Sequence, residues 1–177
     1  MSILRLLGLE PAEGSRDAGA EETETVRRIT RALEALDPAR ARYVASFAFI
    51  LSRVANADLE ISEPETREME RIVREWGRLP EPQAILVVQI AKSQNQLFGG
   101  TENFLVTRQF HATAGPDQKE DLLRCLFAVS AADDSISVVE ENEIWKIASE
   151  LGINHTDYVS IRADFRDKRR VLKDLPA

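Results

Sequence analysis

The spacing of apolar residues predicts helices along almost the whole chain. In each predicted helix, apolar side chains recur three or four positions apart, and charged side chains occupy the other faces. Glycines and prolines separate these segments, and none of them alternates apolar and polar residues with a period of two. The predicted helices cover residues 21–36, 38–57, 62–76, 81–98, 101–113, 117–132 and 137–151, with a last short helix ending near residue 163. We therefore predict an all-α protein, a helical bundle of about seven or eight helices.

Two of the predicted helix pairs repeat each other at a distance of 75 residues. This shift places residues 43–77 on residues 118–152 without a gap. Two apolar stripes coincide: Phe47, Ile50, Leu51 and Val54 with Leu122, Cys125, Leu126 and Val129, and Met69, Ile72, Val73 and Trp76 with Ile144, Ile147, Ala148 and Leu151. Chance amphipathicity rarely produces such agreement. We expect two related helix–loop–helix units that pack face to face with pseudo-twofold symmetry.

Both units contain the loop Asp-x-x-Ile-Ser-x-x-Glu, at Asp58–Glu65 and at Asp133–Glu140. In each copy, the serine and the glutamate three residues later match the capping box that begins a helix. The isoleucine before the serine has the place of a hydrophobic-staple residue, so we expect it to anchor the loop in the core. Capping and packing thus account for the isoleucine, the serine and the glutamate of the motif.

Helix capping does not explain the aspartates of the motif. Asp58 and Asp133 end the first helix of each pair, where a negative charge opposes the helix dipole. Oxygen clusters of this kind suit hard divalent cations such as calcium, magnesium or manganese, although the spacing is not that of an EF-hand. The candidate metal ligands are Asp58, Glu60, Glu65, Asp133, Asp134 and Glu140. For each loop, a cation site and a solvated helical turn both stay open as interpretations.

The two ends of the chain differ from the predicted domain at residues 21–163. Residues 1–20 have the composition of a flexible N-terminal arm, in which residues 1–9 carry enough apolar side chains for a short amphipathic helix. Residues 164–177 have the composition of a basic C-terminal tail. A single short apolar segment binds a membrane only weakly. A peripheral membrane adaptor that uses residues 1–9 is therefore the third and weakest functional hypothesis.

Charge and the scarcity of reactive side chains narrow the function. Thirty acidic and 23 basic residues give a net charge of −7, which disfavours binding to nucleic acid. Cys125 lies in an apolar run and is expected to be an inert core thiol. His111 and His155 have no partners at zinc-ligand spacing, and the chain lacks a phosphate loop and a nucleophile motif. We expect a cytoplasmic protein that is not an enzyme.

Trp145 is the candidate contact for a protein partner. The repeat places it at the position of Glu70, outside the apolar stripe of its helix. Two interpretations stay open. The indole packs against the C-terminal segment, or it is an exposed anchor for a partner, since tryptophan is enriched in binding hot spots. A protein–protein interaction module, with a partner that the sequence does not identify, is thus the second functional hypothesis.

The tandem Ala-Asp-x-x-Ile-x-x-x-Glu loops between amphipathic helices resemble those of the tellurite-resistance TerB family. The resemblance covers about residues 21–163. It implies a compact bacterial helical bundle without known catalysis, association with divalent cations through acidic residues, and a place in stress responses. The residues that match the acidic motif of the family are Asp58, Glu65, Asp133 and Glu140. Our leading hypothesis is accordingly a non-enzymatic TerB-like stress protein that binds a divalent cation.

The loops depart from the family pattern at two positions. The residue after the aspartate is usually glycine in the family, whereas here it is Leu59 or Asp134. The second copy has Ser135 where the first has Glu60. These differences make the two loops unequal as candidate metal sites.

Overall fold

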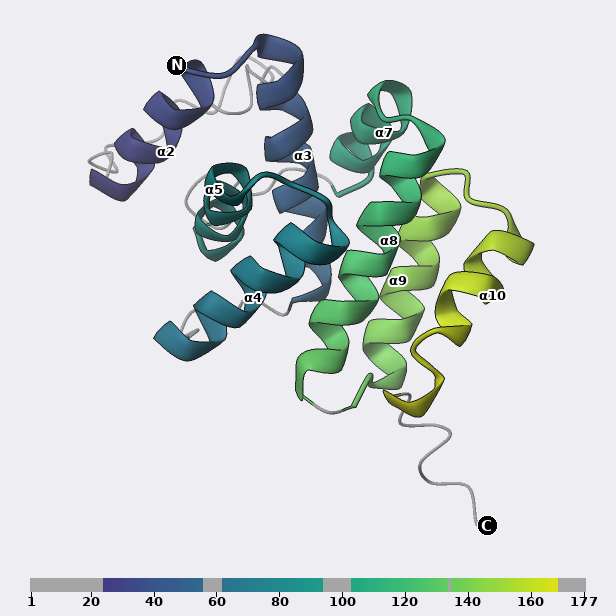
Figure 1. Cartoon of the computed structure of the whole chain (residues 1–177). Helices are drawn as coiled ribbons and strands as arrows, with labels where there is room; N and C mark the ends of the chain where they lie inside the picture. Colours follow the sequence, from purple (N-terminus) through teal and green to yellow (C-terminus); the bar gives the residue numbers. More distant parts are fainter. Residues whose placement is uncertain (1–23, 56–61, 94–102, 134, 169–177) are drawn as a thin grey trace.

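The computed structural model describes residues 24–55, 62–93, 103–133 and 135–168, and these residues form an α-helical bundle (Figure 1). No β-strand occurs in these four ranges. The α-helices are α2 (Glu24–Glu34), α3 (Pro38–Val54), α4 (Glu63–Trp76), α5 (Glu81–Lys92), α7 (Asn103–Thr113), α8 (Pro116–Ser130), α9 (Val138–Glu150) and α10 (His155–Ala163). The 3-10 turns η1 (Ala131–Asp133) and η2 (Arg166–Lys168) follow α8 and α10. The prediction of an all-α bundle is confirmed.

The predicted helix boundaries agree with the structure where capping residues define them. Asp37 caps α3, because its Oδ2 accepts hydrogen bonds from the backbone N–H groups of Ala39 at 3.0 Å and Arg40 at 3.3 Å. Pro38 begins that helix, where the missing N–H costs nothing. α5 ends at Lys92, and residues 94–98 of the longer helix that the sequence predicted lie outside the described residues.

Helix α3 is the centre of the core. Every residue from Tyr43 to Val54 is buried except Arg53. α2, α5, α7, α8 and α9 all pack against it. In Figure 1, α3 runs between the group formed by α2, α4 and α5 and the group formed by α7, α8 and α9. The burial of nearly every face explains why its apolar residues extend beyond a single stripe.

The two apolar stripes of each helix pair face the core, with two departures. Val129 is only partly buried, and the Trp76 side chain is 38% exposed because it lies in the last turn of α4. α4 packs on α8, while α9 packs on α3, so each second helix contacts the first helix of the other pair. The pseudo-twofold relation between the pairs stays a prediction.

The compact fold continues past Ala163, where the sequence predicted a basic tail to begin. Phe165 is only 7% exposed. Its ring stacks on Phe127 of α8 at 5.4 Å and contacts Trp76 at the same centroid distance. The basic residues around Phe165 concealed this anchor, because the net character of the segment is polar. A single aromatic residue is sufficient to hold the end of the helical domain on the core.

We predict that Phe165→Ala lowers the free energy of unfolding by about 3 kcal/mol, because it removes a buried aromatic side chain. The neighbouring exposed Arg166→Ala serves as the control and is expected to change stability by less than about 0.5 kcal/mol. Urea denaturation of both variants measures the difference. Equal stabilities of the two variants would contradict the packing of Phe165.

Candidate functional site

The first acidic loop ends in the capping box that the sequence predicted. Ser62 is the N-cap of α4, and its Oγ accepts a hydrogen bond from the N–H of Glu65 at 3.4 Å. Oε2 of Glu65 accepts in return from the N–H and the hydroxyl of Ser62, both at 2.7 Å. The side-chain hydrogen bond and then the backbone hydrogen bond hold the pKa of Glu65 below its ordinary value.

The second acidic loop ends in the same geometry. Oε2 of Glu140 accepts from the N–H of Ser137 at 2.8 Å and from its hydroxyl at 2.6 Å, while the Ser137 Oγ accepts from the N–H of Glu140 at 3.2 Å. Ile136, just before the cap, is fully buried, as expected for a residue that anchors the loop. The predicted capping role is confirmed in both loops, and it engages one carboxylate oxygen of each glutamate.

The structure does not bring the candidate metal ligands together within its described part. Asp58, Glu60 and Asp134 lie outside the described residues, as does Ile61. Asp133 ends the η1 turn directly after α8, as the repeat predicted, and its side chain is not described. Among the described side chains, no group of three His, Cys, Asp or Glu residues is placed to hold a metal ion. The metal assignment of all six residues therefore stays a prediction.

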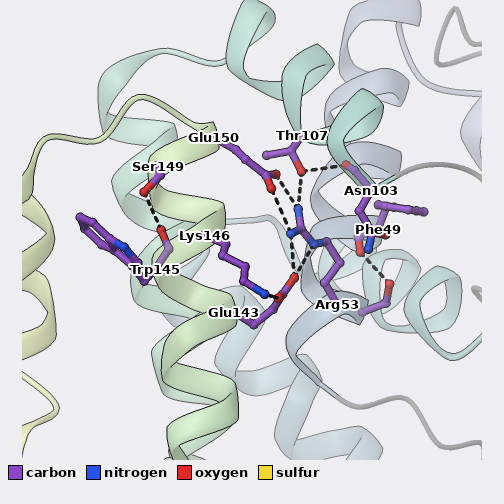
Figure 2. A network of polar contacts seen from close by, with 10 residues as sticks. Phe49, Arg53, Asn103, Thr107, Glu143, Trp145, Lys146, Ser149 and Glu150 are labelled. Carbon is purple, nitrogen blue, oxygen red and sulfur yellow. Dashed lines mark hydrogen bonds and ion pairs between the residues drawn. The ribbon is translucent and has the colours of Figure 1, made fainter.

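A charged cluster that the sequence did not predict lies between α3, α7 and α9 (Figure 2). The Arg53 side chain is only 5% exposed. Its guanidinium donates to Glu143 Oε1 at 2.7 Å, to Glu150 Oε2 at 2.7 Å and to the Thr107 hydroxyl oxygen at 2.7 Å. Thr107 passes the chain of hydrogen bonds to the carbonyl oxygen of Asn103 at 3.1 Å. Three helices are thus tied to one side chain.

The charges of this cluster compensate one another. Burial disfavours the charged form of Arg53, but the hydrogen bonds from Glu150 and Glu143 outweigh burial and raise its pKa further. Lys146 adds a second positive charge, with its Nζ 3.6 Å from Glu143 Oε2. Two cations therefore meet two carboxylates, which is the condition for burying charge without a large penalty.

The corresponding glutamates of the first helix pair make a different contact. Glu68 and Glu75 of α4, which the repeat aligns with Glu143 and Glu150, both bind Arg71 of the same helix at 2.6 Å. All three side chains are nearly half exposed. The repeated glutamates thus stabilise one helix at the surface in the first copy and join helices in the second. The sequence clue to this difference was a single arginine, Arg53, inside an otherwise apolar helical run.

Trp145 lies on the opposite side of α9 from Arg53, as Figure 2 shows. Its indole makes edge contacts with Tyr158 at 4.7 Å and with His155 at 5.7 Å, both on α10. Trp145 thus packs against the C-terminal helix, one of the two interpretations of the sequence, and 39% of it remains exposed. A role in binding a partner stays a prediction.

The remaining reactive side chains have structural contacts. His111 Nδ1 lies 2.6 Å from the carbonyl oxygen of Leu151, the residue that caps the end of α9. The next residue, Gly152, has φ +69°, and a Cβ there would lie 2.9 Å from His111 Cε1. Burial raises the pKa of the Cys125 thiol, which suits an inert core residue. None of the described helices has the length and apolar character to cross a membrane.

We predict that Arg53→Met lowers the free energy of unfolding by about 3 kcal/mol, because it leaves two partly buried carboxylates without their cation. Arg71→Met removes the analogous contact at the surface and is expected to leave stability nearly unchanged. Chemical denaturation at low and high salt measures both variants. Equal losses in the two variants would contradict the distinction between the buried and the exposed cluster.

We also predict that wild type is more stable than Glu65→Gln above pH 4.5, the ordinary pKa of this carboxyl group. Because the pKa is lowered in the folded state, this advantage is lost as the pH falls through the lowered value. Denaturation from about pH 7 down to about pH 3 measures the difference. Glu70→Gln, in the middle of α4, serves as the charge-matched control. A difference that does not vary with pH would contradict the assignment.

A family model described as Tellurite resistance protein TerB matches residues 44–163. The matched range runs from α3 to the end of α10 and includes both acidic loops and the Arg53 cluster. No curated protein and no solved structure was found to match the chain. Because the family model spans more than half of the sequence, this chain belongs to the TerB family.

Proposed function

We propose that this TerB protein is a non-enzymatic, cytoplasmic stress-response protein, related to tellurite resistance, that binds a divalent cation at its acidic loops. The observation that carries the proposal is the identical end of both loops, where Ser62–Glu65 and Ser137–Glu140 fix a carboxylate in the same way. In each case the contacts engage Oε2, and Oε1 has no hydrogen bond to another described residue. A carboxylate oriented in advance loses less entropy when it binds an ion.

The stem of the second loop offers further oxygen atoms. The last carbonyl groups of α8 lack partners within the helix, as at every helix C-terminus. Ser130, three residues before Asp133, has a buried hydroxyl without a hydrogen-bond partner among the described residues. Carbonyl, hydroxyl and carboxylate oxygens are ligands that calcium accepts readily. A cation would also neutralise the unfavourable charge of Asp133 at the end of the first helix.

Titration calorimetry of the full chain with calcium, magnesium and manganese tests the proposal. We expect saturable binding with a dissociation constant on the order of 10⁻⁴ M, since the site is exposed and has few charges. Asp58→Asn with Asp133→Asn is expected to abolish the heat of binding. Glu70→Gln with Glu81→Gln removes the same charge outside the loops and is expected to retain it. No saturable heat with wild type, or the same heat with the loop variant, would refute the proposal.

A further inference from the structure

A cavity of about 240 Å³ lies where the beginning of α3, the end of α7 and the first turn of α8 meet. It is separate from both acidic loops, because α3 leads toward the first loop only at its other end. The residues that line it are Ala39, Arg40, Arg42, Tyr43, Thr113 and Gln118. Its charged lining consists of two arginines, and none of the described carboxylates belongs to it. In a protein of net charge −7, this is a local concentration of positive charge.

Contacts outside the cavity orient the Arg40 guanidinium. Its Nε donates a hydrogen bond to Gln83 Oε1 at 2.8 Å, and its Cζ lies 4.9 Å above the centre of the Tyr43 ring. Neither contact uses the two terminal nitrogens of the guanidinium. Within the described residues, no ion pair joins Arg40 to a carboxylate. A guanidinium held in this way has its bidentate face available for a planar or tetrahedral oxyanion.

Tyr43 supplies a second, independent indication of a ligand. Its side chain is only 8% exposed, and its ring contacts Phe47 at 6.0 Å and Phe110 at 5.3 Å. Its hydroxyl has no hydrogen-bond partner among the described residues. A buried hydroxyl without a partner is costly, so structures usually provide one. Burial raises the pKa of Tyr43 to about 12, so at neutral pH the hydroxyl retains its proton and can donate it to an acceptor.

The first turn of α8 adds a favourable dipole beside the cavity. Gly115 is the N-cap of this 15-residue helix and has no side chain that accepts from the first N–H groups. Gln118, in the same turn, lines the cavity, while its Oε1 accepts from the N–H of Gly115 at 2.8 Å. Its amide nitrogen is a donor. The positive end of the helix dipole favours a negative ligand at this place.

A second cavity of similar size shows what distinguishes this one. That cavity, about 270 Å³ between α4 and α5, is lined by three arginines but also by Glu70 and Glu81. One of its arginines, Arg71, is already engaged by Glu68 and Glu75. The positive charge there is compensated within the protein. It provides a matched control for the experiment.

We propose that the cavity between α3, α7 and α8 binds a small oxyanion, a carboxylate or phosphate-type group. Arg40 contacts two of its oxygens, the Tyr43 hydroxyl donates to an oxygen, and Arg42 and Gln118 complete the lining. The volume is below the range typical of pockets for drug-sized ligands, which limits the ligand to a small ion or a small organic acid. This inference is independent of the proposed cation sites.

Titration calorimetry of the full chain with inorganic phosphate, acetate and tellurite at low ionic strength tests the inference. Tellurite is included because it is itself a small oxyanion. The three anions distinguish a phosphate-type, a carboxylate and a chalcogen oxyanion ligand. We expect saturable 1:1 binding of at least one of them. Arg40→Gln is expected to weaken this binding at least about tenfold, because a charge-assisted hydrogen-bond pair is lost.

Tyr43→Phe removes only the hydroxyl and keeps the ring in the core, so it tests the site without disturbing the fold. We expect it to weaken binding about fivefold. Arg67→Gln, in the second cavity, is expected to leave the affinity unchanged. The inference is overturned if wild type binds none of the three anions saturably, or if Arg67→Gln weakens binding as much as Arg40→Gln. Equal affinities of wild type and Tyr43→Phe would overturn the assignment of the hydroxyl.

Discussion

Arg53 places a positive charge against the central helix of the bundle, and the neighbouring helices are arranged around that constraint. A guanidinium that is 5% exposed must have anionic partners, and α9 provides two of them one helical face apart, at Glu143 and Glu150. Because α9 begins at Ser137, this ion pair also fixes the stem of the second acidic loop relative to α3. The last turn of α3, which contains Arg53, precedes the first acidic loop. One buried interaction therefore positions the stems of both loops.

The loop motif serves two physical purposes that the structure separates. Ser62 and Glu65, like Ser137 and Glu140, satisfy the N–H groups at the beginning of a helix, and this function accounts for their spacing. The same hydrogen bonds leave each glutamate with one engaged and one available oxygen. What the fold itself does not require is the aspartate at the end of the preceding helix. The proposed cation site therefore depends mainly on Asp58 and Asp133.

Opposite charges are distributed toward the two ends of α3. The helix is 17 residues long, about 25 Å from end to end. Its beginning contributes Arg40 and Tyr43 to a cavity without carboxylates, and its end leads to the first acidic loop. The negative net charge of the chain is thus an average over regions that favour different ligands. A sequence-wide charge count predicts long-range behaviour, but a binding site responds to the charges within a few ångströms.

Local interactions determined what the sequence alone predicted: the helical class, the caps of α3, α4 and α9, and the buried stripes are set by residues within one or two turns. The burial of Ile136 and the packing of Trp145 on α10 were also accessible, because apolar side chains off a solvated face need cover. The tertiary structure alone decided the partners of Arg53, the anchoring of Phe165 and the cavity at Arg40. Each of these joins residues from different helices, and their proximity depends on how the helices cross. Glu143 and Glu68 illustrate the reason, since the same residue at equivalent positions of the repeat binds across helices in one copy and within a helix in the other.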